Sequence, residues 1–89
     1  MANELSFASG LVAIIRTKTA DEARAAANAL ISAGVDVIEF TTTTPAVFDL
    51  IEEFASNTSN TGVHVGLGTA MNRSHVLSGK DAGAKFVIS

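Results

Sequence analysis

Apolar runs of strand length alternate with amphipathic segments along the whole chain. The runs lie at residues 11–15, 35–40, 63–67 and 86–88. They consist mostly of Val, Ile, Leu and Phe, although Asp36 and Glu39 interrupt the second run, and His64 and Gly66 the third. Such runs are typical of strands buried on both faces, as in a parallel sheet covered by helices. The pattern therefore predicts four strands.

The segment after the first run carries a clear helix start. Thr19 is followed three residues later by Glu22, the spacing at which a Thr hydroxyl and a Glu carboxylate cap each other's backbone N–H. The helix is expected to run to about Ala33. Gly34 fits the position just beyond the helix, because glycine reaches left-handed backbone angles without a Cβ penalty.

The second helix is predicted to begin at Pro45, with Thr44 as its N-cap, because the first helical position does not need the N–H that proline lacks. Its core-facing stripe is expected to be Val47, Leu50, Ile51 and Phe54. The turn-forming residues 56–62 end it.

A third helix is expected from about Arg73 to Gly83, with Val76, Leu77 and Ala82 turned inward. Strand and helix thus repeat about every 25 residues, which implies parallel strands joined by three crossover helices.

The segments at residues 33–38 and 82–87 share a helix-ending Ala-Gly, one charged residue and an apolar strand, two β-α units apart. This repeat favours a (β/α) barrel, although flavodoxin-like folds use the same local pattern. Residues 1–89 are expected to form one partial barrel domain, with strand order 1-2-3-4 along a curved sheet or 2-1-3-4.

Composition and charge narrow the possible partners. The net charge is −3, which gives no electrostatic reason to expect nucleic acid or an acidic membrane surface. The absence of cysteine excludes disulfides and thiolate metal sites. The start of the chain lacks the basic and apolar regions of a signal peptide, and no apolar run is long enough to cross a bilayer. A cytoplasmic protein is the expectation.

Polar residues at the carboxyl ends of parallel strands are where such folds bind ligands. In chain order these are Arg16, Glu39, the stretch Gly66-Leu67-Gly68-Thr69, and Ser89. On the rim of a barrel they would converge on one pocket.

Glu39 is the most informative of these residues, because it interrupts an apolar strand. Burial would raise the pKa of its carboxyl toward the range useful for proton transfer. The alternative is a structural ion pair with Arg16, whose planar guanidinium could also clamp a carboxylate or phosphate.

Residues 41–44 are all threonine. They could offer hydroxyls and a helix N-terminus to an anion, or serve as ordinary turn and cap residues. The Gly-Leu-Gly-Thr stretch is typical of a loop whose backbone approaches a ligand closely. It does not continue into a dinucleotide-binding fingerprint, because Ala70, Met71 and Asn72 follow.

The histidines are weak candidates for metal ligands, and the lysines for a nucleophile. His64 and His75 have no partner at ligand spacing, so no metal site is expected. Lys80 and Lys85 are expected to be solvated, and Lys18 to lie in an exposed loop. None of the three lysines has the desolvated setting that would activate its amine for attack on a carbonyl.

Taken together, residues 13–16, 33–41, 44–45, 66–69 and 82–89 resemble the 2-keto-3-deoxy-6-phosphogluconate / 4-hydroxy-2-oxoglutarate aldolase family. The resemblance implies the first four strands of a trimeric TIM (β/α)8 barrel. It also implies class I aldolase chemistry, in which a lysine forms a Schiff base with a 2-keto acid and cleavage gives pyruvate and an aldehyde. The family uses no metal or organic cofactor.

The resemblance also assigns roles. Glu39 matches the catalytic glutamate, Arg16 the strand-one arginine near the substrate, and Gly68 and Thr69 the loop beside the pyruvyl carboxylate. Thr43 falls where many members have an arginine for the substrate's distal anionic end and others have threonine, so a phosphorylated substrate is not implied.

The family's lysine lies on the sixth strand, beyond the last run of this chain. We therefore expect the chain to be inactive alone, and to assemble as a homo-oligomer or with a second polypeptide that supplies the missing strands. Two alternatives remain open: a non-catalytic, self-associating half-barrel, and a phosphate-binding barrel isomerase or epimerase that uses Glu39 without a lysine.

Overall fold

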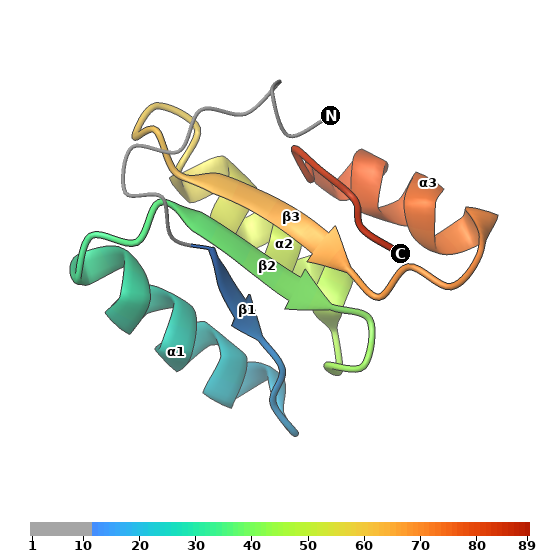
Figure 1. Ribbon diagram of the computed structural model, residues 1–89, viewed down its shortest axis with the longest axis horizontal. Helices are drawn as coiled ribbons and strands as arrows, with labels where there is room; N and C mark the ends of the chain where they lie inside the picture. The colour runs from blue at the N-terminus through green and yellow to red at the C-terminus, as the bar shows by residue number, and fades with distance from the viewer. Residues whose placement is uncertain (1–11) are drawn as a thin grey trace.

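A computed structural model describes residues 12–89. Strands and helices alternate along the chain (Figure 1), in the order β1 (Ala13–Ile15), α1 (Ala20–Ser32), β2 (Val37–Thr41), α2 (Val47–Asn57), β3 (His64–Gly68) and α3 (Arg73–Ala82). The alternation and the presence of a helix after each of these strands agree with the sequence prediction.

The three strands form one parallel sheet in the order β1-β2-β3. Ile14, Glu39 and Gly66 lie in register across the sheet, and the three strand ends point to the same edge (Figure 1). The prediction of parallel neighbours in chain order is confirmed for these strands, and the order 2-1-3 is wrong. The sheet is compatible with part of a (β/α) barrel.

The predicted fourth strand does not form as a regular element. Val87 makes a single parallel bridge with Leu67, supported by hydrogen bonds from Leu67 N to Phe86 O (3.0 Å) and from Ile88 N to Leu67 O (2.8 Å). The segment therefore lies beside β3 in the predicted direction. Within residues 12–89 it has no further neighbour to pair with, and Ile88 remains 49% exposed.

The core lies between the sheet and the helices. Alternate strand residues, including Ile38, Phe40 and Leu67, contribute to one buried cluster with side chains of α1 and α2, and α2 lies behind β2 and β3 in Figure 1. The rings of Phe40 and Phe54 tie β2 to α2, with centroids 5.3 Å apart.

The sheet face opposite the helices carries Ile14, Glu39 and Gly66. β2 is buried along its whole length, but Ile14 is 61% exposed. The expectation that the first strand is buried on both faces is therefore wrong, because in this part of the chain only one of its faces packs against helices. Leu11, assigned to the same strand, lies outside the described residues.

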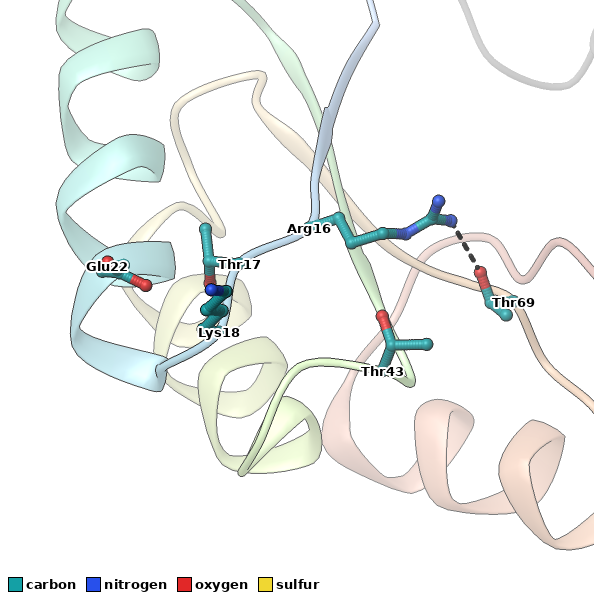
Figure 2. A pocket seen from close by; sticks show the side chains of 6 residues that line it. All are labelled: Arg16, Thr17, Lys18, Glu22, Thr43 and Thr69. Carbon is teal, nitrogen blue, oxygen red and sulfur yellow. Dashed lines mark hydrogen bonds between the residues drawn. The ribbon is translucent and has the colours of Figure 1, made fainter.

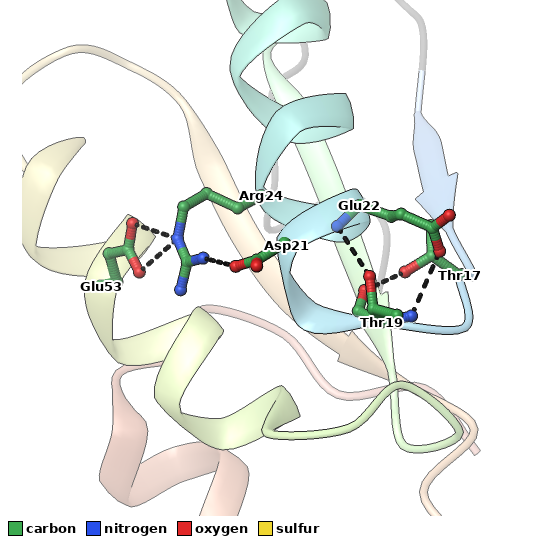
Figure 3. A network of polar contacts seen from close by, with 6 residues as sticks. All are labelled: Thr17, Thr19, Asp21, Glu22, Arg24 and Glu53. Atoms are coloured by element: carbon green, nitrogen blue, oxygen red, sulfur yellow. Dashed lines mark hydrogen bonds and ion pairs between the residues drawn. The ribbon is translucent and has the colours of Figure 1, made fainter.

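Helix α1 begins and ends as the sequence predicts. Glu22 N donates to Thr19 Oγ1 (3.1 Å) and Thr19 N donates to Glu22 Oε1 (3.2 Å), which is the predicted capping box (Figure 3). Gly34 follows with a φ of 100°.

Arg24, one turn into the same helix, joins α1 to α2 (Figure 3). Its Nε donates to both carboxylate oxygens of Glu53 at 3.1 Å, and its Nη1 donates to Asp21 at 2.8 Å.

The predicted start of the second helix is wrong. Helix α2 begins at Val47, preceded by Ala46 with a left-handed φ of 58°. A left-handed residue cannot belong to a right-handed helix, so Pro45 lies in the turn before it. Thr44 does not cap the helix, because Ala46 occupies the N-cap position and no side chain makes a cap hydrogen bond. The predicted inward stripe is confirmed: Val47, Leu50, Ile51 and Phe54 are all buried.

Helix α3 is rotated relative to the prediction. Val76 and Leu77 are exposed at 42% and 46%, whereas Gly79 is buried, and a Cβ there would lie 2.9 Å from Leu67 Cδ2. The helix thus approaches β3 through a bare backbone position, and Val76 and Leu77 fall on the outer side. Ala82 packs against the core, as predicted.

No helix among residues 12–89 is long and apolar enough to cross a membrane.

Candidate functional site

A wide, open depression lies at the edge where the strands end. Figure 2 shows the side chains that line it, which are Arg16, Thr17, Lys18, Glu22, Thr43 and Thr69. Glu22 lies in the first turn of α1, and the other five lie in the loops that follow the three strands. The parallel order of the strands therefore brings these loops to one place, as the sequence analysis predicts.

Arg16 and Thr69 meet at one side of this depression. Arg16 Nη2 donates to Thr69 Oγ1 at 3.3 Å across 53 residues of sequence (Figure 2). Arg16 is exposed, so the other N–H groups of its planar guanidinium can hold a carboxylate or phosphate, which such a fork fits in a bidentate way.

Glu39 lies next to this pair but within the sheet. It is 6% exposed, and its side chain occupies the space in front of Gly68, where a Cβ would collide with its carboxylate. Glycine at residue 68 is therefore what allows the Glu39 side chain to extend across β3.

Burial raises the pKa of the Glu39 carboxyl above its ordinary value, and the positive charge of Arg16 lowers it by less. Among residues 12–89 the ion pairs join Arg24 to Asp21 and to Glu53, so the structural ion pair between Glu39 and Arg16 is not formed. The predicted rise of the pKa is confirmed. A carboxyl in this setting can exchange a proton at pH values where an exposed glutamate stays ionised.

Thr69 has an unusual backbone conformation, with a left-handed φ of 59°. A β-branched residue in this region costs about 1–3 kcal/mol and persists only where surrounding contacts hold it. Two hydrogen bonds hold the peptide group that joins Thr69 to Ala70. Thr42 Oγ1 donates to its carbonyl oxygen, Thr69 O, at 2.6 Å, and its N–H, on Ala70, donates to Ile88 O at 3.1 Å.

The four consecutive threonines have different environments. Thr41 and Thr43 share a hydrogen bond of 2.8 Å between their hydroxyls, and Thr42 contacts Thr69. Thr44 Oγ1 is buried and has no hydrogen-bond partner among residues 12–89. Of the two readings left open for these threonines, the anion site at a helix N-terminus is not formed, because α2 begins at Val47. Only Thr43 lines the depression.

The structure thus brings Arg16, Thr43 and Thr69 to one depression and places Gly68 and Glu39 directly behind Thr69. The sequence analysis missed two features. Thr42 was not singled out among the threonines. Lys18 was considered only as a nucleophile, although it lines the depression and lies in a loop that follows a strand, where binding residues gather.

The histidines do not form a metal site in the part of the chain that the structure describes, since no three His, Cys, Asp or Glu side chains gather there. His75 has a local structural role: its Nδ1 accepts a hydrogen bond from Met71 N at 3.0 Å, and its own N–H donates to the cap residue Asn72 at 2.9 Å.

Comparison with known proteins supplies one match. A family model described as KDPG and KHG aldolase matches residues 3–89, nearly the whole chain. A comparison with curated proteins finds no match.

Proposed function

The chain belongs to the KDPG and KHG aldolase family, and we propose that it supplies the carboxylate-binding and proton-transfer part of a class I aldolase site. The reaction is the reversible cleavage of 2-keto-3-deoxy-6-phosphogluconate or 4-hydroxy-2-oxoglutarate to pyruvate and an aldehyde. Family membership supports aldolase-type lyase chemistry in general. The assignment to individual residues is our proposal.

The observation that carries the proposal is the arrangement of Glu39 behind the Arg16–Thr69 pair. The Arg16 guanidinium and the Thr69 hydroxyl, joined at 3.3 Å, would bind the carboxylate of the 2-keto acid. The keto carbon of that substrate would then lie toward the sheet. Glu39 is the buried carboxyl on that side.

Glu39 would move protons in this arrangement. The pKa of its carboxyl is raised by burial, so the protonated form persists to higher pH than in an exposed glutamate. Such a group can protonate the hydroxyl that leaves a carbinolamine and then take up a proton in the next step.

The distal end of the substrate would face Thr43. This residue supplies a neutral hydroxyl. Besides Arg16, the charged side chains that line the depression are those of Lys18 and Glu22. An anionic group, either a second carboxylate or a phosphate, fits this side of the depression, and the neutral Thr43 does not by itself select phosphate.

The nucleophile would be a lysine outside residues 1–89. Lys18, Lys80 and Lys85 are all exposed, and an exposed lysine lacks the desolvation that leaves its amine neutral at physiological pH. We therefore propose that the 89-residue chain binds keto acid without forming a Schiff base.

Borohydride trapping with pyruvate tests the proposal. Treatment of the purified chain should leave its mass unchanged. After mixing with a fragment of a family member that carries the strand with the lysine, treatment should add a reduced pyruvyl group to that fragment, and Glu39→Gln should slow the addition. A mixture that assembles but gives no adduct would rule out the aldolase assignment. An adduct on the chain alone would show that one of its own lysines reacts.

A further inference from the structure

The backbone of Thr69 is held by a side chain that the proposed function does not use. We propose that Thr42 is a positioning residue: its hydroxyl fixes the Thr69 carbonyl and so keeps the Thr69 side chain at the depression. The inference rests on the proposed function only for the identity of the ligand that binds in the depression. The positioning itself stands on the contacts around Thr69.

The geometry of the contact supports this role. Thr42 Oγ1 donates to Thr69 O at 2.6 Å, and Thr42 N donates to Gly68 O at 3.1 Å. Thr42 thus binds two consecutive carbonyls of the loop after β3. A change of the Thr69 backbone to an extended conformation would swing its carbonyl away from the Thr42 hydroxyl, so this contact opposes the change.

Two further hydrogen bonds lie around Thr69, and Thr42 is the side chain that binds its backbone. Arg16 binds the Thr69 side chain rather than its backbone, at 3.3 Å, and Arg16 is itself exposed. The bond from Ala70 N to Ile88 O, at 3.1 Å, holds the N–H side of the same peptide group and acts together with the Thr42 bond. Among the four threonines, Thr41 and Thr43 bind each other, so Thr42 is the hydroxyl directed to the loop after β3.

The consequence for ligand binding is indirect. Thr69 lines the depression in its left-handed conformation (Figure 2), which threonine alone does not favour. Without the Thr42 hydroxyl, the backbone of Thr69 would spend less time in this conformation. The affinity for a carboxylate ligand would fall, although Thr42 itself does not line the depression.

NMR of the isotope-labelled 89-residue chain tests the role directly. A positive φ brings the amide and α protons of a residue close together, so Thr69 should show a strong intraresidue NOE. In Thr42→Val this NOE should weaken, and the dissociation constant for pyruvate, measured by titration, should rise roughly three- to tenfold, the effect of losing one hydrogen bond. Thr42→Ser keeps a hydroxyl and should restore both values.

Thr44→Val is the matched control, because it removes a hydroxyl with no hydrogen-bond partner among residues 12–89. It should leave the NOE and the affinity unchanged. An undiminished NOE in Thr42→Val would overturn the positioning role, whatever pyruvate does. If the parent chain does not bind pyruvate, the proposed function fails while the NOE still decides the role of Thr42.

Thr42→Ala repeats the test with a smaller side chain, which cannot clash with its neighbours where threonine fits. Unfolding of both the Val and the Ala variants, with Thr42→Ser folded, would show that the hydroxyl is needed for the fold as a whole and would also overturn the proposal.

Discussion

Two opposing effects act on the pKa of the Glu39 carboxyl. Burial in the sheet disfavours the charged carboxylate, while the charge of Arg16 favours it, and the first effect is the larger. The carboxylate therefore reduces stability at neutral pH in exchange for a proton that can be transferred. The buried position of Glu39 leads to two predictions about single residues.

The first concerns the pH dependence of stability. Below the ordinary Glu value of 4.5 both the folded and unfolded states hold the proton, and burial costs little. As the pH rises from there through the raised folded pKa, the unfolded state loses its proton first, so the free energy of unfolding should fall and then level off. Glu39→Gln should lack this fall.

Denaturant unfolding of both chains across this pH range measures the difference. The free energy of unfolding of Glu39→Gln minus that of the parent chain should grow with pH above the ordinary Glu value and then become constant. Glu52→Gln, at an exposed residue of α2, is the matched control. A difference that does not change with pH would mean that Glu39 is not desolvated.

The second prediction concerns Gly68, in front of which the Glu39 side chain lies. Gly68→Ala should lower the free energy of unfolding by about 1–3 kcal/mol, because the new methyl group meets the carboxylate. In a Glu39→Ala background the same change should cost much less. Equal costs in the two backgrounds, measured by denaturant unfolding, would show that the two residues do not touch.

Most of the site residues could be predicted from the sequence, because polar residues that directly follow apolar runs must lie at the ends of strands. Arg16 and Thr69 were found in this way, and Glu39 was singled out because it interrupts an apolar run. The role of Thr42 could not be predicted, since its partner lies 27 residues away. The left-handed backbone of Thr69 is not a preference of threonine, so it could not be predicted either.

The helices show which of their ends and orientations can be predicted from signals in the local sequence. Helix α1 follows its capping box and its final glycine closely. The start of α2 does not follow its Thr-Pro signal, because Ala46 occupies the N-cap position and turns the chain into the helix. The orientation of α3 depends on the contact between Gly79 and Leu67, which no pattern of apolar residues within the helix indicates.

Ala46 gives a prediction at this scale. A left-handed alanine costs about 1–2 kcal/mol, whereas glycine accepts this conformation and loses about 0.5–1 kcal/mol through its freer unfolded chain. Ala46→Gly should therefore raise the free energy of unfolding by about 0.5–1 kcal/mol. Ala33→Gly, at a right-handed residue with a φ of −83°, should lower it. Thermal unfolding compares the two, and destabilisation by Ala46→Gly would contradict the left-handed start of α2.

For the whole molecule, the parallel order of the sheet could be predicted from the repeat of strand and helix. The fourth strand could not, because an apolar run becomes a strand only when neighbours pair with it, and Val87 pairs with β3 alone. Apolar side chains on the sheet face opposite the helices remain exposed, above all Ile14 at 61%.

We expect the chain to self-associate through this face. Light scattering should give a molar mass well above 9.1 kDa, and Ile14→Thr, which keeps a β-branched side chain but removes apolar surface, should shift the chain toward the monomer. Val76→Thr, on the outer side of α3, is the matched control. A monomer at all concentrations, or equal effects of the two changes, would contradict this expectation.

The central claim is that the edge where the strands end binds a keto acid through Arg16 and Thr69. Titration of the labelled chain with pyruvate, followed by amide chemical shifts, tests it most directly. We predict saturable shifts concentrated at Arg16, Gly68 and Thr69, strongly reduced in Arg16→Leu and retained in Arg73→Leu, which removes an arginine from the start of α3. Absence of saturable shifts, or equal binding by both arginine variants, would contradict the account.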